Sequence, residues 1–264
     1  MIFFEVFRKS LKNLVDLIFP WGKCRICRLE IEYGVVPGIC FSCFKKRKKT
    51  KGNLCQICSR EMPCAEQGSI CGICEEDRPA YDKHFNRYQY EGAIREMVLN
   101  FKAVRRYPIA RLIGRSIARE VKKNGREVKF DYVTFIPSSL KRRLWLGFSP
   151  AELIARTVSK ELHVPIADIL RLQKRPRTQK GLTASERKEN FRGAFACRRS
   201  FQDDETVLLV DDIFTTGSTI GEASLVLKQS GARVFTATFA MTGRRAPDLA
   251  GDTGRLDPGT PRVK

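Results

Sequence analysis

The most informative part of the chain reads Val207-Leu208-Leu209-Val210-Asp211-Asp212-Ile213-Phe214-Thr215-Thr216-Gly217-Ser218-Thr219. An unbroken run of apolar, strand-forming residues leads into two adjacent acids, a short loop of hydroxyl residues with one glycine, and then a helical pattern. A strand that is buried on both faces of a parallel sheet ends at the carboxyl edge, where open α/β folds place their ligands. The pattern therefore predicts an α/β protein with a ligand site directly after this strand.

The loop after the strand has the composition of an anion site. Its hydroxyl side chains are Thr215, Thr216, Ser218 and Thr219. Successive backbone N–H groups beside a helix N-terminus also attract an anion, and Gly217 allows the backbone to turn and approach it. A phosphate would be repelled by Asp211 and Asp212, so we expect these acids to face ribose hydroxyls or a metal. The alternative is a buried strand with an Asp-rich turn and no ligand.

Composition favours a polyanionic partner. The 264 residues, 42% of them apolar, suffice for one medium domain and a small module. The formal net charge of +20 favours nucleic acid above other partners, although a basic surface without a function is the alternative. We find no segment long and apolar enough to span a bilayer, and we expect a cytoplasmic protein.

The first 20 residues have the pattern of an amphipathic helix. Their apolar positions are Ile2, Phe3, Val6, Phe7, Leu14, Val15 and Ile18. Charged residues interrupt the stretch at helical spacing, which argues against a signal peptide, and Pro20 ends it. Docking onto the rest of the chain is the favoured use, and a partner helix or membrane surface is the alternative.

The cysteines form a duplicated pattern. Cys24, Cys27, Cys40 and Cys43 are followed, each 31 positions later, by Cys55, Cys58, Cys71 and Cys74. Two Cys-x-x-Cys knuckles together supply the four sulfurs of a structural zinc site, so residues 21–79 are predicted to form a double zinc ribbon. Disulfides would need an oxidising compartment. The pairing of the knuckles stays open, because the first could also cross to the second repeat. Cys64 and Cys197 are read as ordinary thiols.

A highly basic segment separates the two knuckle pairs. It contains Lys45, Lys46, Arg47, Lys48, Lys49 and Lys51. These cations repel one another, which predicts a solvated connector unless a polyanion binds them. In the latter case the segment is a phosphate-contacting patch whose affinity falls with salt. Tyr33, Phe41 and Phe44 are nearby aromatic residues for stacking, but core positions are the more common use of such residues in a small ribbon.

Residues 80–243 alternate between strand and helix patterns. Strands are expected at 85–90, 132–136 and 233–240, and helices around 94–101, from Pro108 to Asn124, and after Thr219. The second helix has an apolar face that consists of Ile109, Leu112, Ile113, Ile117 and Val121. Ser149-Pro150-Ala151-Glu152 reads as a capping box with proline at the first helical position. Residues 170–195 lose periodicity and predict a long basic loop, and residues 244–264 predict a disordered tail.

The stretch from Val207 to Thr219 resembles the phosphoribosyl pyrophosphate (PRPP) signature of type I phosphoribosyltransferases. The whole pattern resembles the ComF family of bacterial competence proteins, which includes ComFC and GntX-like relatives. That resemblance rests on the apolar N-terminal helix, the cysteine knuckles, Tyr90 to Lys102, the Ile136-Pro137 loop, Arg175 to Phe195 and the PRPP signature. One departure is Leu146-Gly147-Phe148-Ser149-Pro150, where family members usually carry Arg-Gly-Phe-Asn-Gln.

The resemblance implies a phosphoribosyltransferase-like parallel sheet flanked by helices, behind a zinc module. It assigns the ribose of PRPP to Asp211 and Asp212, which are also the implied catalytic residues, and the 5′-phosphate to the loop Thr215–Thr219, with magnesium as cofactor. The candidates for the pyrophosphate side are Ser138, Ser139, Arg142, Arg143, Arg175, Arg177 and Lys180. The implied setting is the handling of single-stranded DNA during natural transformation, with other competence or recombination proteins as partners. An active transferase with an unidentified acceptor and a PRPP-sensing regulator are the alternatives.

Overall fold

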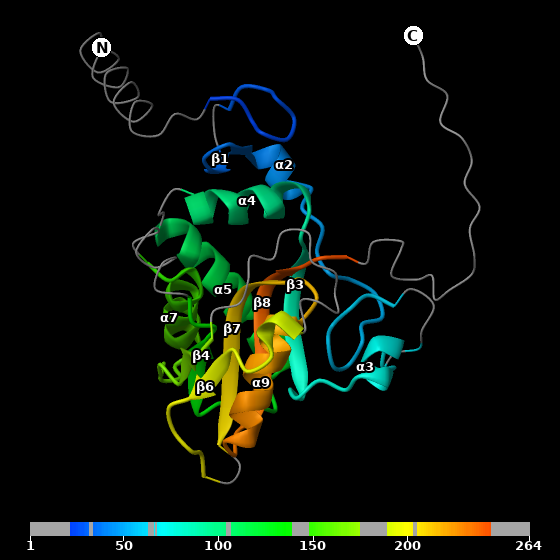
Figure 1. Ribbon diagram of the computed structural model, residues 1–264. Coiled ribbons are helices and arrows are strands. Elements are labelled where there is room, and N and C mark those ends of the chain that lie inside the picture. The colour runs from blue at the N-terminus through cyan, green and yellow to red at the C-terminus, as the bar shows by residue number, and fades with distance from the viewer. Residues whose placement is uncertain are drawn as a thin grey trace, which may run out of the picture.

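A four-stranded parallel sheet forms the centre of the molecule (Figure 1). The computed structural model describes residues 22–31, 34–62, 66, 68–103, 107–138, 148–174, 189–202 and 205–243. The strands are β3 (Lys83–Gln89), β4 (Tyr132–Phe135), β7 (Thr206–Phe214) and β8 (Arg233–Met241), in the order β3-β8-β7-β4. All three neighbouring pairs are parallel. The prediction of an α/β fold with a parallel sheet is confirmed.

Alternation along β7 divides the core into two layers. Leu208 and Val210 belong to one buried cluster, whose helices are α4 (Gly92–Ala103), α5 (Tyr107–Asn124) and α7 (Pro150–Leu162). Val207 and Leu209 belong to the other, together with residues of α9 (Ser218–Gln229) and of the hairpin β5 (Leu170–Leu172) and β6 (Phe195–Cys197). Because both faces of β7 are covered, its apolar run is continuous rather than alternating. None of the described helices combines the length and the apolarity that crossing a membrane requires.

The two cysteine groups lie in different places. We call Cys24, Cys27, Cys40 and Cys43 the first cysteine group, and Cys55, Cys58, Cys71 and Cys74 the second. Next to the first group, the hairpin β1 (Gly34–Val36) and β2 (Ile39–Cys40) and helix α2 (Phe41–Lys45) lie above α4 (Figure 1). The second group, with α3 (Gly72–Glu76), packs in the same buried cluster as α9, beside β3.

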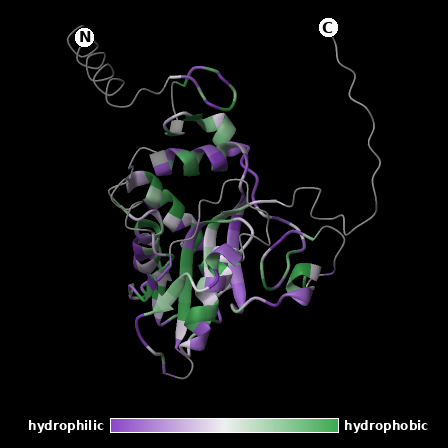
Figure 2. Ribbon diagram, viewed as in Figure 1, coloured by the Kyte–Doolittle hydropathy of each residue, from purple (hydrophilic) through white to green (hydrophobic). Residues whose placement is uncertain are grey.

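The second cysteine group explains how a hydrophilic strand is accommodated inside the fold. Figure 2 shows β3 as largely hydrophilic and β7 as largely hydrophobic, yet His84 and Asn86 of β3 are buried. The backbone N–H of His84 donates to the carbonyl of Ile57, and Ser59 donates to the carbonyl of His84. The His84 ring lies between the hydroxyls of Thr236 and Thr238, at 2.8 and 3.0 Å. Residues of the second knuckle therefore pair with the backbone of His84 and β8 pairs with its ring, while Oδ1 of Asn86 is buried without a hydrogen-bond partner among the described residues.

Four details differ from the sequence-based expectations. β7 continues past the two acids to Phe214, because β8 pairs with it along the whole length. Leu112, expected on the buried face of α5, is 38% exposed, and the small residues Ala110, Gly114 and Ala118 fill that face instead. The basic stretch 170–195 is not a loop throughout, since β5 pairs with β6. The capping box is also wrong, because Ser149 makes no side-chain cap to α7.

Candidate PRPP and metal sites

The two acids of the signature lie at the carboxyl edge of the central sheet. Asp211 is in register with Thr238 of β8, and its carboxylate accepts a hydrogen bond from the backbone N–H of Asp212, at 2.8 Å. Asp212 is 8% exposed, and its carboxylate oxygen Oδ2 lies 2.7 Å from Nζ of Lys102 in α4. Sequence reasoning did not assign a role to Lys102. The stretch from Tyr90 to Lys102 is part of the family resemblance, but the sequence indicates no partner for the lysine, and only the fold brings it to Asp212.

The loop after β7 has the geometry of a backbone anion site. Gly217 has φ of +86°, and a Cβ placed there would lie 2.6 Å from the Phe214 ring. Only glycine fits both the left-handed backbone and the ring beneath it. Thr216 Oγ1 lies 2.9 Å from Ser218 Oγ. The N-cap residue Gly217 has no side chain to cap α9, a twelve-residue helix, and the Thr216 hydroxyl accepts only a long hydrogen bond, 3.4 Å, from the backbone N–H of Ser218 in the partly exposed loop.

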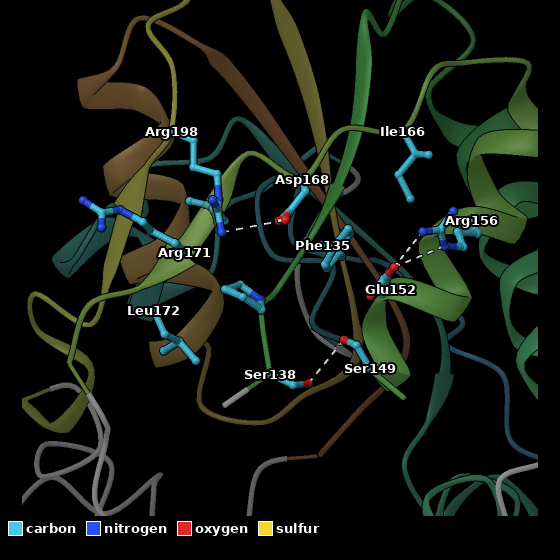
Figure 3. Close-up of a pocket in the computed structure, with 12 residues that line it drawn as sticks. Phe135, Ser138, Ser149, Glu152, Arg156, Ile166, Asp168, Arg171, Leu172 and Arg198 are labelled. Atoms are coloured by element: carbon cyan, nitrogen blue, oxygen red, sulfur yellow. Dashed lines mark hydrogen bonds and ion pairs between the residues drawn. The ribbon is translucent and has the colours of Figure 1, made fainter. Parts of the chain in front are cut away.

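The loop after β4 lies beside this edge. Phe135 is in register with Val210, and the backbone N–H of Ile136 donates to the carbonyl of Val210. Ser138, two residues further on, lines a cavity of about 460 Å³ that also contains Arg156, Arg171 and Arg198 (Figure 3). Two of these arginines are already paired, Arg156 with Glu152 at 2.8 Å and Arg198 with Asp168 at 3.8 Å.

Ser149 belongs to this cavity rather than to the helix cap. Its hydroxyl lies 3.3 Å from the hydroxyl of Ser138 (Figure 3), while Glu152, the expected partner of the capping box, pairs with Arg156 in the next turn. Proline at the first position of α7 was predicted correctly. The other candidates for the pyrophosphate side lie outside the described residues: Ser139, Arg142, Arg143, Arg175, Arg177 and Lys180.

Each cysteine group brings together the four sulfurs of one repeat. Within each group the sulfur atoms all lie within 4.8 Å of one another, which fits a four-thiolate site for a single ion. The alternative in which a knuckle crosses to the other repeat is therefore excluded. The second group is entirely buried, whereas Cys27 of the first group is exposed. Cys197 is a separate free thiol, and Cys64 lies outside the described residues.

The thiols of the second group are held in unequal protonation states. Hydrogen bonds from Cys58 and Cys74 lower the pKa of the Cys55 thiol far below its usual range. Its thiolate in turn raises the pKa of Cys74 well above the ordinary value. A buried cluster that already favours one thiolate fits a cation of the zinc type, because thiolates are the ligands that zinc takes in structural sites.

The basic segment is not a free connector. Lys49 forms a β-bridge with Tyr88, and the carbonyl of Lys48 accepts from the backbone N–H of Gln89. Arg47 lies 4.3 Å from the Phe44 ring and donates to the hydroxyl of Tyr88. The side chains of Lys45, Lys46, Lys49 and Lys51 are exposed. The segment therefore lies along the outer edge of β3, and β8 separates that strand from β7.

A family of known proteins matches the part of the chain that contains this edge. Residues 149–253 match the sequence model of the family described as phosphoribosyl transferase domain. This range contains α7, β7, α9 and β8, and with them the whole edge from Asp211 to Thr219. This part of the chain is therefore similar to the phosphoribosyl transferase domain family.

The relatives agree with the predicted resemblance. Competence protein F of Haemophilus influenzae is 28% identical over 215 residues, which cover 79% of this chain and 92% of that protein. DNA utilization protein YhgH of Escherichia coli is also 28% identical, over 80% of this chain and 92% of that protein. Competence protein ComFC of Bacillus subtilis is 24% identical, over 77% and 83%. The chain is a homologue of these competence and DNA utilization proteins.

Solved phosphoribosyltransferases show more distant likeness. Adenine phosphoribosyltransferase of Saccharomyces cerevisiae is 19% identical and has a TM-score of 0.34, covering 54% of this chain and 71% of that one. Orotate phosphoribosyltransferase of Aeropyrum pernix is 17% identical with a TM-score of 0.31, covering 60% and 71%.

Proposed function

We propose that the carboxyl edge of β7 binds PRPP together with magnesium. The observation that carries the proposal is the succession, on one strand end, of two acids, a left-handed glycine and the amide groups of α9. The 5′-phosphate lies on the amides and hydroxyls of Thr215 to Thr219, and the ribose hydroxyls donate to Asp211 and Asp212. The pyrophosphate extends toward Ser138, because the loop after β4 leaves the sheet beside β7.

Lys102 has a defined part in this arrangement. Its ammonium group holds the Asp212 carboxylate and offsets the repulsion between the two acids and a phosphorylated sugar. In a transferase reaction the bond between C1 and pyrophosphate breaks through a cationic, oxocarbenium-like sugar, which the carboxylates near the ribose favour. Magnesium would supply positive charge to the leaving pyrophosphate. A PRPP-binding regulator without turnover is the second candidate, and the departure from the family pattern at Leu146, Ser149 and Pro150 favours it.

We also propose that the protein handles single-stranded DNA. The exposed lysines along β3 and the net charge of +20 support this role, since cations that contact phosphates release counterions. The names of the relatives, competence protein and DNA utilization protein, point in the same direction. Both cysteine groups hold structural zinc in this proposal.

Calorimetry tests the PRPP site. Hydrogen bonds to charged groups contribute about 1.5–3 kcal/mol, so Asp212→Asn is expected to weaken PRPP binding in the presence of magnesium by about ten- to a hundredfold. Glu120→Gln is the matched control, because Glu120 is also a partly buried carboxylate 2.7 Å from a cation, Arg87, but lines neither the signature loop nor the cavity at Ser138. Equal affinities of the wild type and Asp212→Asn, or no binding by either, would mean that the signature is only a structural turn.

A further inference from the structure

The two copies of the cysteine repeat differ sharply in burial. All four cysteines of the second group are buried, and they share a buried cluster with Tyr81 and Phe214, beside β3. The first group meets the rest of the protein through the β1–β2 hairpin, where Ile39 packs on α4 and Pro37 accepts a hydrogen bond from Asn100. Cys24 is buried, but Cys27 is exposed and Cys40 and Cys43 are partly exposed. The greater burial of the second group is typical of a structural support, whereas the exposed part of the first group is accessible to a partner.

The two copies also have opposite charge. Residues 23–51 contain nine Lys or Arg and two Asp or Glu, a net charge of +7. Residues 54–82, the same window shifted by 31 positions, contain two Lys or Arg and six Asp or Glu, a net charge of −4. The first copy therefore carries +7 of the chain's net +20, while the second copy is acidic. Such a surface attracts a polyanion at the first copy and repels it at the second.

The first copy adds exposed apolar side chains to this charge. Phe41, the first residue of α2, is 62% exposed, which contradicts the core position expected for it. Sγ of Cys27 lies 3.8 Å from Sγ of Cys40, the residue before Phe41, so the knuckle that carries Ile26 and Leu29 meets the start of α2. Ile26 is 38% exposed and Leu29 is 69% exposed. An aromatic face surrounded by cations is the combination on which single-stranded bases stack while their phosphates are neutralised.

The matching positions of the second copy lack this combination. Shifted by 31 residues, Phe41 corresponds to Gly72, Lys45 to Glu76 and Lys46 to Asp77. Gly72, Glu76 and Asp77 are all exposed, so burial does not explain the exchange. The two copies have the same spacing of metal ligands but surfaces of opposite charge. They differ at the residues that would contact a nucleic acid.

We propose that the first cysteine group is a base-stacking surface for single-stranded nucleic acid, with Phe41 as its platform and Lys45 and Lys46 as phosphate contacts. The second cysteine group, the copy with the acidic surface, acts only as a support of the sheet. This inference rests on the proposed binding of single-stranded DNA and names the residues that perform it.

Fluorescence anisotropy with two labelled probes tests the inference. One probe is a strand of twenty thymidines, and the other is an abasic strand of the same length, which has phosphates but no bases. Stacking on one aromatic side chain changes affinity by roughly fivefold to a hundredfold. Phe41→Gly, which installs the residue of the second copy, is therefore expected to weaken thymidine binding by that factor and to leave abasic binding unchanged. Phe41→Trp is expected to retain thymidine binding.

Matched substitutions at the second copy complete the test. Ile73→Ser removes an exposed apolar side chain next to the second group and is expected to change neither affinity. Lys45→Glu with Lys46→Asp, again the residues of the second copy, is expected to lower both affinities. Phe41→Gly with wild-type affinity, or with equal losses on both probes, would overturn the inference while leaving the proposed DNA binding intact. Wild-type protein that binds neither probe would remove the proposed DNA binding and the inference with it.

Discussion

His84 shows how a single buried residue ties the second cysteine group to the sheet. Its ring is fully enclosed and lies 4.5 Å from the ring of Phe214, the residue under the Gly217 turn. Burial, helped by the positive charge of Arg60, lowers the pKa of His84 to about 3. The ring is therefore neutral in the folded protein throughout the physiological range.

This lowered pKa predicts acid sensitivity with a definite sign. As pH falls below about 6.5, the unfolded chain takes up a proton on His84 while the folded protein does not. The unfolded state is thereby stabilised, and the free energy of unfolding decreases. Between pH 7.5 and pH 5 the loss should be about 2 kcal/mol. His84→Gln should have lower stability at pH 7.5 but a pH dependence shallower by that amount. Urea unfolding at both pH values, with zinc present, measures the difference. Parallel pH curves for the two proteins would contradict the assignment.

Single residues also mark the limit of what the sequence predicts. Asp211, Asp212 and Gly217 were selected as candidates from their order along one strand and loop, because the roles proposed for them follow from local chemistry. Lys102 was not, since its partner is distant along the chain and only the packing of α4 brings them together. Ser149 was assigned to a helix cap because its neighbours fit that pattern, but the hydroxyl of Ser138 attracts it instead.

Among the elements, the two cysteine groups give the sharpest contrast. The second group shares a buried cluster with Phe214 and Ile220, on either side of the signature loop. The group and the loop also line one cavity of about 770 Å³, to which Cys58, Cys74, Thr216 and Gly217 contribute. The first group has no described residue in that cluster or in that cavity.

Matched cysteine substitutions should therefore affect the PRPP site differently. Cys43 and Cys74 occupy the same position of the two repeats. Cys74→Ser should lower the melting temperature and weaken PRPP binding at least tenfold, because the support beneath Phe214 is lost. Cys43→Ser should leave PRPP affinity within about twofold of the wild type. Calorimetry with PRPP and magnesium on both variants measures the difference. An equal effect of the two substitutions would show that the second group does not support the loop.

We expect one zinc ion for each intact cysteine group. Elemental analysis of protein purified without chelator should give two zinc ions per chain, because each set of four sulfurs is complete within its repeat. Cys43→Ser and Cys74→Ser should each give one. Less than one zinc in the wild type would contradict the proposed zinc sites, and one would mean that a single group binds metal.

The sequence predicted the elements with strong periodicity and missed those defined by distant partners. α4, α5, β7 and β8 follow from apolar spacing and turn residues, within a few positions. The β5–β6 hairpin was missed because its strands are three residues each and are separated by a long polar stretch. The basic segment was predicted to be a connector because a run of charged side chains does not indicate how the backbone pairs. In the structure its backbone forms hydrogen bonds with the edge of β3.

For the whole molecule, charge predicts how DNA binding responds to salt. Each lysine that contacts a phosphate of single-stranded DNA contributes about 0.7 to the slope of log affinity against log salt. Replacing Lys45, Lys46, Lys49 and Lys51 with Gln should flatten that slope by nearly 3. Arg47 is kept because it packs on Phe44 and bonds to Tyr88. The control removes four exposed cations of α5, Arg111, Arg119, Lys122 and Lys123. A slope that changes equally in both variants would assign the effect to net charge alone.

The molecule as a whole is proposed to hold two ligands at two separate places. PRPP belongs to the carboxyl edge of β7, and single-stranded DNA belongs to the first cysteine group and the outer edge of β3. β8 lies between β3 and β7, so the two sites do not share a strand. Both ligands are polyanions, and a charged protein could bind either of them without specificity. The place where each ligand binds, rather than its affinity, therefore distinguishes two specific sites from a generally basic surface.

Hydrogen exchange measured along the chain locates both ligands in one experiment. With saturating PRPP and magnesium, protection should increase at residues 211–221, where the loop amides and the first turn of α9 bind the 5′-phosphate. With a strand of twenty thymidines, protection should increase at residues 23–29 and 41–51 and stay unchanged at residues 211–221. PRPP that gives no protection at residues 211–221, or that protects the same basic segments as the thymidine strand, would contradict the account.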